Sequence, residues 1–88
     1  MSYDILWHEN ALKDLKKIDK DQARSIIEKI EQYLVKDPHR LGKPLTGHLK
    51  GLFRYRKGKY RVIYNIKEEE LIFLVLKTGR RDGIYNKD

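Results

Sequence analysis

The spacing of apolar residues changes near the middle of the chain from a helical period to a strand period. In residues 9–35 the apolar residues recur every three or four positions, whereas in residues 52–66 apolar and basic residues largely alternate. The chain has 88 residues and no cysteine. It can therefore build only one modest core, without disulfides or thiolate metal sites. We predict a single domain that spans residues 1–88.

Two apolar stripes predict an antiparallel helical hairpin over residues 9–19 and 20–35. Asp19 stands three residues before Gln22, a spacing typical of a capping box, which ends one helix and starts the next. Pro38 is expected to stop the second helix, because proline cannot continue one. The stripes consist of Ala11, Leu12, Leu15 and Ile18, followed by Ala23, Ile26, Ile27, Ile30, Tyr33 and Leu34.

Four strand-like runs accompany the helices. They cover residues 3–7, 52–57, 59–66 and 71–77. The last run is apolar at successive positions, so we expect a central strand that is covered on both faces. Residues 39–51 hold three glycines and a proline and are predicted to form a loop. The order β-α-α-β-β-β predicts an α+β fold, with the helical hairpin packed on a small, mainly antiparallel sheet.

The positive charge lies in the second half of the chain. Residues 1–40 carry eight Lys and Arg against eight Asp and Glu, whereas residues 41–88 carry twelve against five, a net charge of +7. No acidic residue occurs between Asp37 and Glu68. An excess confined to one region attracts polyanions, of which nucleic acid is the commonest. The alternative is a charged surface that only keeps the protein dissolved.

The predicted hairpin of residues 52–66 separates basic from aromatic side chains. Successive side chains of a strand point to opposite faces, and a two-residue turn at either Lys57-Gly58 or Gly58-Lys59 preserves those faces. A three-residue turn would mix them. One face displays Arg54, Arg56, Lys59 and Arg61, and the reverse, which can pack on the helices, displays Phe53, Tyr55, Tyr60, Val62 and Tyr64.

Cations gathered on one face of a hairpin indicate a role other than folding. Like charges placed opposite each other destabilise a sheet by about 0.2–1 kcal/mol per pair. A rigid basic surface can instead bind phosphate, since the planar guanidinium group gives paired hydrogen bonds to phosphate oxygens. The alternative is a basic strand edge that prevents aggregation between sheets.

The segment after the last strand adds further candidates. Gly79 lets the backbone turn, and Arg81 follows close behind it. Tyr85 can stack on a base or direct its hydroxyl toward a ribose or phosphate, the alternative being an apolar side chain that closes the end of the sheet. The neighbouring cations that we expect to contact RNA are Lys50, Lys57, Lys59 and Arg80.

Other chemistries find little support. His8 and His39 lack metal-ligand spacing with His48, and no Walker loop, paired-carboxylate or Ser-His-Asp signature occurs, so we expect no metal and no cofactor. His48 is a remote candidate for a proton carrier, because it is close in sequence to the basic hairpin. The N-terminus does not read as a signal peptide, and the longest apolar run, residues 71–76, is too short to cross a membrane. We predict a cytoplasmic protein.

Most of the sequence resembles one known family. The stretch LFRYRKGKYRVIYNI followed by LVLKTGRRDGIY closely resembles the RelE group of the RelE/ParE toxin superfamily. The segments KPLTGHLKGL and YDILWHENALKDLKKI are similar to the family's entry to its second strand and to its opening strand and first helix. The resemblance implies a type II toxin that cuts mRNA in the ribosomal A site without a metal, by attack of a ribose 2′-hydroxyl on the adjacent phosphate.

The resemblance also implies catalytic residues. Arg54 and Arg56 match the two basic residues of the family's second strand, and Arg61 matches the arginine that faces them. Arg81 and Tyr85 match the arginine after the last strand and the tyrosine near the end. In some relatives the strand positions are lysines, but arginine stays protonated, so neither strand residue can act as a general base here.

The resemblance implies a partner and leaves alternatives. A toxin of this family pairs with a RelB-like antitoxin, and its targets are the ribosome and mRNA. One alternative function is a ParE-like, non-enzymatic toxin that acts on DNA gyrase. Another is a plain RNA-binding module, which would bind RNA in a salt-sensitive manner without arresting growth.

Overall fold

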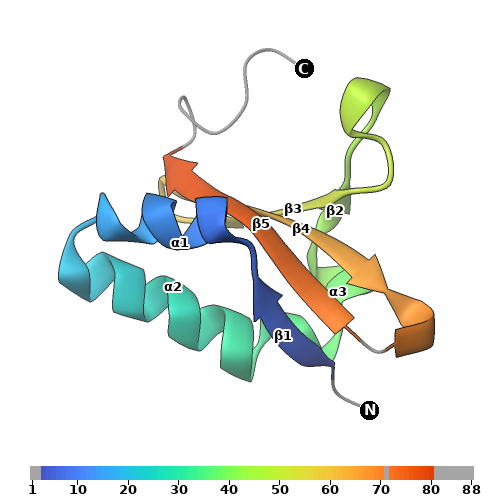
Figure 1. The fold of residues 1–88 in the computed structure, drawn as a ribbon, viewed down its shortest axis with the longest axis horizontal. Coiled ribbons are helices and arrows are strands. Elements are labelled where there is room, and N and C mark those ends of the chain that lie inside the picture. The colour runs from blue at the N-terminus through green and yellow to red at the C-terminus, as the bar shows by residue number, and fades with distance from the viewer. Residues whose placement is uncertain (1–2, 71, 81–88) are drawn as a thin grey trace.

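The computed structural model describes residues 3–70 and 72–80, which form a five-stranded sheet with two helices packed on one face (Figure 1). The helices are α1 (Glu9–Lys16), α2 (Lys20–Gln32) and the short α3 (Pro38–Leu41). The strands are β1 (Asp4–Trp7), β2 (Lys43–Pro44), β3 (Phe53–Lys57), β4 (Tyr60–Lys67) and β5 (Ile72–Arg80). The connections in this part of the chain include the 3₁₀ turns η1 (Leu34–Lys36), η2 (Gly47–Leu49) and η3 (Glu68–Glu70).

The strands lie in the order β1-β5-β4-β3-β2. β1 runs parallel to β5, and the other neighbouring pairs are antiparallel. A parallel pair needs a long connection, and the helical hairpin that follows β1 begins that connection. β5 lies between β1 and β4, which confirms that the last strand is an interior strand and not an edge strand. The α+β fold and the mainly antiparallel sheet are confirmed as well.

The two main helices begin where side chains can cap them. His8 Nδ1 accepts a hydrogen bond from the Asn10 backbone N–H (3.0 Å), and an Asp19 carboxylate oxygen accepts one from the Asp21 N–H (3.2 Å). Each bond satisfies one of the free donors in a first helical turn. The predicted cap at Asp19 is therefore confirmed, although its recorded bond goes to the second residue of α2 and not to Gln22.

The helix ends and the loop prediction need correction. α1 ends at Lys16 and α2 at Gln32, each three residues before the predicted end, because the last turns continue as non-helical backbone or as η1. Pro38 does not stop α2. It begins α3, where its fixed φ and missing N–H suit the first helical position. Residues 39–51 are not a plain loop, since they contain most of α3, β2 and η2.

The core lies between the helices and the sheet. Its buried members are Ala11, Leu15, Ile26, Ile30, Leu34, Val35, Val62, Tyr64 and Val75. Leu12 and Tyr33 were expected in the apolar stripes, but their side chains are 45% and 43% exposed. Both lie at the margins of their stripes, where a helix turns away from the sheet. In the part of the chain that the structure describes, we find no helix long and apolar enough to cross a membrane.

A buried threonine of β5 connects this strand to α1. The Thr78 hydroxyl donates to the Ala11 carbonyl oxygen (3.3 Å), and the Thr78 backbone N–H donates to an Asp14 carboxylate oxygen (3.2 Å). Thr78 is only 2% exposed. Its neighbour Gly79 pairs with Arg61 of β4. The end of β5 that adjoins the basic hairpin is thus fixed to the helical layer.

Candidate active site

The turn between β3 and β4 determines which side chains share a face. Lys57 pairs with Tyr60, and Arg56 pairs with Arg61, so the two-residue turn is Gly58-Lys59. This is one of the two turns expected from the sequence, and it preserves the predicted faces. Gly58 has a φ of +62°, a conformation that glycine adopts without steric cost.

We define the arginine face as the surface formed by Arg54, Arg56 and Arg61. Arg56 and Arg61 are directly opposite each other, and Arg54 lies two residues before Arg56 on the same strand. The helices cover the reverse of the sheet, where Phe53 and Tyr64 stack with ring centroids 5.6 Å apart. The predicted separation of basic from aromatic side chains is confirmed for the two strands.

The three guanidinium groups differ in exposure. Arg61 is 6% exposed, Arg54 is half-buried and Arg56 is exposed. The Nε of Arg54 is buried and has no hydrogen-bond partner among the described residues. A buried donor without a partner is costly, and a bound ligand is one usual explanation. Electrostatic attraction is also stronger near buried charge than in bulk water.

Two residues of the arginine face, Arg54 and Arg56, are not neutralised by a carboxylate of the described residues. Within residues 3–70 and 72–80, neither Arg54 nor Arg56 forms an ion pair with a carboxylate. The ion pairs found there join Lys13 to Glu9, His39 to Glu68 and Arg40 to Asp37. Among the described residues, no carboxylate would have to leave Arg54 or Arg56 for a phosphate to bind there.

Strand β2 adds a cation that sequence reasoning missed. Lys43 pairs with Arg54, and residues paired directly across a sheet share a face. The side chain of Lys43 is exposed. This two-residue strand was missed because residues 39–51 were predicted to form a loop. Pro44, followed by the apolar Leu45, was the one sequence signal for it, since proline is accepted in edge strands.

Of the other predicted cations, Lys57 and Lys59 do not lie on the arginine face. Lys57 lies on the helical side, next to Gln22 of α2, because it pairs with Tyr60. Lys59 belongs to the turn and lines the same hollow as Gln22 of α2, so its expected place on the arginine face is wrong. Lys50 is exposed and follows η2. The backbone of Arg80 pairs with Tyr60.

Two predicted catalytic residues cannot be placed. Arg81 and Tyr85 lie outside the described residues. The strand that precedes them ends at Arg80, one position after the Gly79 that pairs with Arg61. Their predicted roles stay predictions.

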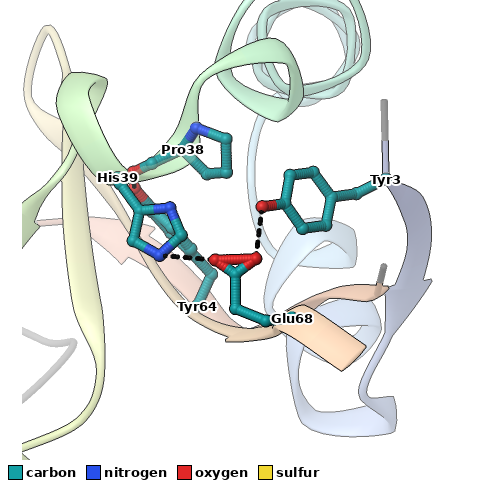
Figure 2. A network of polar contacts seen from close by, with 5 residues as sticks. All are labelled: Tyr3, Pro38, His39, Tyr64 and Glu68. Carbon is teal, nitrogen blue, oxygen red and sulfur yellow. Dashed lines mark hydrogen bonds and ion pairs between the residues drawn. The ribbon is translucent and has the colours of Figure 1, made fainter. Parts of the chain in front are cut away.

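His39 belongs to a polar network with Glu68 of η3 and Tyr3. His39 Nε2 contacts a Glu68 carboxylate oxygen at 3.1 Å, and the Tyr3 hydroxyl donates to the other oxygen at 2.8 Å (Figure 2). This hydrogen bond raises the pKa of the Tyr3 hydroxyl. His48 lies in η2, outside the strands. The described residues contain no group of His, Cys, Asp or Glu that could hold a metal ion.

The arrangement favours anion binding over acid–base chemistry. Guanidinium groups donate hydrogen bonds and keep their charge at any physiological pH. The arginine face consists of three arginines, and the residue that pairs with Arg54 on β2 is a further cation, Lys43. Such a surface can hold phosphates and stabilise negative charge that develops on their oxygens.

Comparison with protein families places the chain among the toxins of type II toxin–antitoxin systems. The model of the ParE toxin of the type II toxin–antitoxin system (ParDE) matches residues 5–85. The chain is 32% identical over 87 residues to Toxin RelG of Mycobacterium tuberculosis, which covers 99% of this chain and 100% of that protein. It is 34% identical over 83 residues to Toxin RelE of the same organism, covering 94% of this chain and 86% of that protein.

Solved structures agree with these sequence relatives. The RelBE2 toxin–antitoxin complex of Mycobacterium tuberculosis contains a similar chain, with a TM-score of 0.88, 31% identity and coverage of 92% of this chain and 93% of that chain. The archaeal RelE–RelB complex of Pyrococcus horikoshii OT3 is similar with a TM-score of 0.71 and 28% identity, covering 94% and 99% of the two chains.

Proposed function

The chain belongs to the RelE/ParE superfamily of toxins from type II toxin–antitoxin systems, and from this premise we propose that it is a ribosome-dependent mRNA endonuclease. The ribose 2′-hydroxyl of an A-site nucleotide attacks the adjacent phosphate. The bond from phosphorus to the 5′-oxygen breaks, which leaves a cyclic phosphate and a free 5′-hydroxyl. Translation stops because the message is cut. An enzyme that acts on translating ribosomes works in the cytoplasm.

The arginine face is the observation that carries this proposal. Attack on a phosphate concentrates negative charge on the phosphorane oxygens, and fixed cations lower the barrier by stabilising that charge. Arg61, held by its burial, and Arg56, directly opposite, are suited to this task. We assign the same role to Arg81, and to Tyr85 the stacking on, or orientation of, the attacked nucleotide.

No general base is assigned on the face. Arg54 and Arg56 stay protonated, so neither accepts the proton of the 2′-hydroxyl. Most of the rate enhancement would then come from charge stabilisation and from in-line alignment of the message by the ribosome. Because the ribosome supplies the alignment, ribosome dependence is part of the proposal. The proposed reaction also needs no metal ion.

An antitoxin partner follows from the family. RelBE2 of Mycobacterium tuberculosis and RelE–RelB of Pyrococcus horikoshii were each solved as toxin–antitoxin complexes. We propose a RelB-like antitoxin for this chain. Its acidic segments would be attracted to the basic surface, and an amphipathic helix could pack near the exposed Leu12 and Tyr33 of the helical layer.

Incubation with programmed ribosomes tests the proposed activity. We expect a break within the A-site codon that needs the ribosome and continues in the presence of a metal chelator. The same message without ribosomes should be cut far more slowly. An intact message on programmed ribosomes would contradict the proposal, as would full activity after Arg61→Ala combined with Arg81→Ala.

A second candidate function is action on DNA gyrase, as a ParE-like toxin. It is favoured by the family model, whose description names the ParE toxin. This function does not require the arginine face, so the two candidates differ in what Arg61→Ala would do. Trapped gyrase–DNA cleavage complexes, unaffected by that substitution, would support it. Salt-sensitive RNA binding without cleavage or growth arrest would instead indicate a plain RNA-binding module.

A further inference from the structure

The junction between α3 and β2 is fixed against the core of the sheet. The hydroxyl of Tyr64 donates a 2.6 Å hydrogen bond to the carbonyl oxygen of Pro38, and Tyr64 is fully buried. A Cβ added at Gly42 would overlap the oxygen of that hydroxyl. Gly42 therefore lets the chain pass directly over the Tyr64 ring as α3 ends and β2 begins.

A second set of contacts holds α3 at the same place. His39 Nε2 lies 3.1 Å from a carboxylate oxygen of Glu68 (Figure 2). The His39 ring also meets the Phe53 ring edge-on, with centroids 5.6 Å apart. These contacts tie α3 to η3 and to β3. The start of β2 is thus set by the packing of α3 as well as by its own pairing with β3.

The fixed junction places Lys43 beside Arg54. Neighbouring strands lie about 4.8 Å apart, so β2 is one such spacing from Arg54 and about 10 Å from the strand of Arg61. Lys43 is exposed and forms no ion pair among the described residues. A row of cations therefore crosses the sheet from its β2 edge to β4, wider than one phosphate group.

We propose that Lys43 binds a second phosphate of the RNA strand whose scissile phosphate lies at Arg56 and Arg61. Tyr64 and Gly42 position Lys43 for this contact. The inference rests on the proposed function, because the ligand is the same RNA. Lys43 makes no contact with the reacting atoms. It holds the neighbouring part of the strand, with Arg54 between the two phosphates, and so fixes the direction in which the message crosses the face.

Salt-dependent binding of a single-stranded RNA oligonucleotide tests the role of Lys43. Loss of one phosphate contact lowers the slope of log K against log salt by about 0.7. We expect this loss for Lys43→Gln and a normal slope for Lys43→Arg, which keeps the charge. The matched control is Lys16→Gln, an exposed lysine of α1 on the helical side of the sheet.

Tyr64→Phe tests the positioning role, with circular dichroism to establish that the variant folds. It removes the hydroxyl that bonds Pro38 and keeps the ring. If the junction positions Lys43, the affinity lost in Lys43→Gln is smaller in the Tyr64→Phe background than in the unmodified protein. Equal losses in the two backgrounds would overturn the positioning role.

The binding and cleavage assays separate the two proposals. An unchanged slope in Lys43→Gln, an equal loss in Lys16→Gln or no RNA binding at low salt would overturn the inference about Lys43. If those outcomes accompany normal A-site cleavage, the proposed function stands and Lys43 has no part in it. A reduced slope without A-site cleavage supports the phosphate contact and overturns the ribosomal activity.

Discussion

At the scale of single residues, the permanent charge of arginine decides what the candidate site can do. Lysine can lose its proton when its pKa falls, whereas the guanidinium of Arg54 or Arg56 does not. Both residues therefore act by binding and by stabilising charge. Arg61 is the most buried of the three, so its attraction for phosphate is least screened by water.

Replacement of Arg56 by alanine should lower the cleavage rate by the same factor at different pH values. We expect a loss of about 10²-fold, the usual effect of removing one group that stabilises transition-state charge. The ratio of the two rates is measured on programmed ribosomes at about pH 6.5 and pH 8.5, where guanidinium keeps its charge throughout. A ratio that grows steeply with pH would indicate that Arg56 supports a titrating base.

The buried tyrosine of β4 should make the fold sensitive to alkali. Burial raises the pKa of the Tyr64 hydroxyl above its ordinary value of 10.0. The neutral form is therefore favoured in the folded state, and its contribution is present below pH 10 and lost as the pH rises further. Above pH 10 we expect the free energy of unfolding to fall more steeply than in Tyr64→Phe, by up to about 1.4 kcal/mol per pH unit.

Urea denaturation at about pH 8 and pH 11 measures this difference. At the lower pH, Tyr64→Phe should be less stable by about 1 kcal/mol, the usual value of one lost hydrogen bond. At the higher pH the gap should close or reverse. Parallel pH profiles of the two proteins would contradict the assignment of the alkaline loss to Tyr64.

At the scale of elements, the β3–β4 hairpin is the unit that gathers the arginines. Its faces follow from the alternation of side chains, and Gly58 supplies the positive φ that this two-residue turn requires. A shift of one residue in pairing would move Arg61 to the helical side. The turn therefore controls the composition of the face.

Replacement of Gly58 by alanine should destabilise the hairpin. A left-handed conformation costs an L-residue about 1–2 kcal/mol, and no atoms lie near the added Cβ to add a clash. Gly58→Asn is the matched control, because asparagine tolerates this conformation better than alanine. Chemical denaturation compares the two variants. Equal stability of Gly58→Ala and the unmodified protein would contradict the turn that we describe.

Local sequence patterns predict the hairpin and the two main helices, but they do not predict the short elements α3 and β2, which depend on tertiary contacts. The alternation of side chains around Arg54 and Arg56 can be predicted from the sequence. The strand at Lys43 cannot, because two residues carry no period. It directly follows Gly42, which passes close to the Tyr64 hydroxyl that binds the Pro38 carbonyl oxygen of α3. Likewise, the sequence predicts that Pro38 ends a helix, whereas in the structure Pro38 begins α3.

At the scale of the whole molecule, the sheet separates the hydrophobic core from the candidate site. The helical layer and its core lie on one side, and the arginine face lies on the other. The net charge of +7 falls within residues 41–88, the part of the sequence that includes the three arginines of this face. An excess of positive charge attracts polyanions from solution and, by the same physics, an acidic partner.

Co-expression with the neighbouring reading frame tests the predicted antitoxin. We expect a complex that purifies intact at low salt and prevents cleavage on programmed ribosomes. Weakening of the complex by salt would reflect the screening of its charged contacts. Recovery of the toxin alone, under conditions where the neighbouring protein is expressed and folded, would contradict the pairing.

The most direct test of the account compares two double variants that remove the same charge from opposite sides of the sheet. Arg56→Ala with Arg61→Ala empties the arginine face, whereas Lys16→Ala with Arg24→Ala removes two exposed cations from α1 and α2. Single-turnover cleavage of an A-site codon should fall by at least about 10²-fold in the first variant and stay within a few-fold of normal in the second. Equal rates in the two variants would contradict the assignment of catalysis to the arginine face.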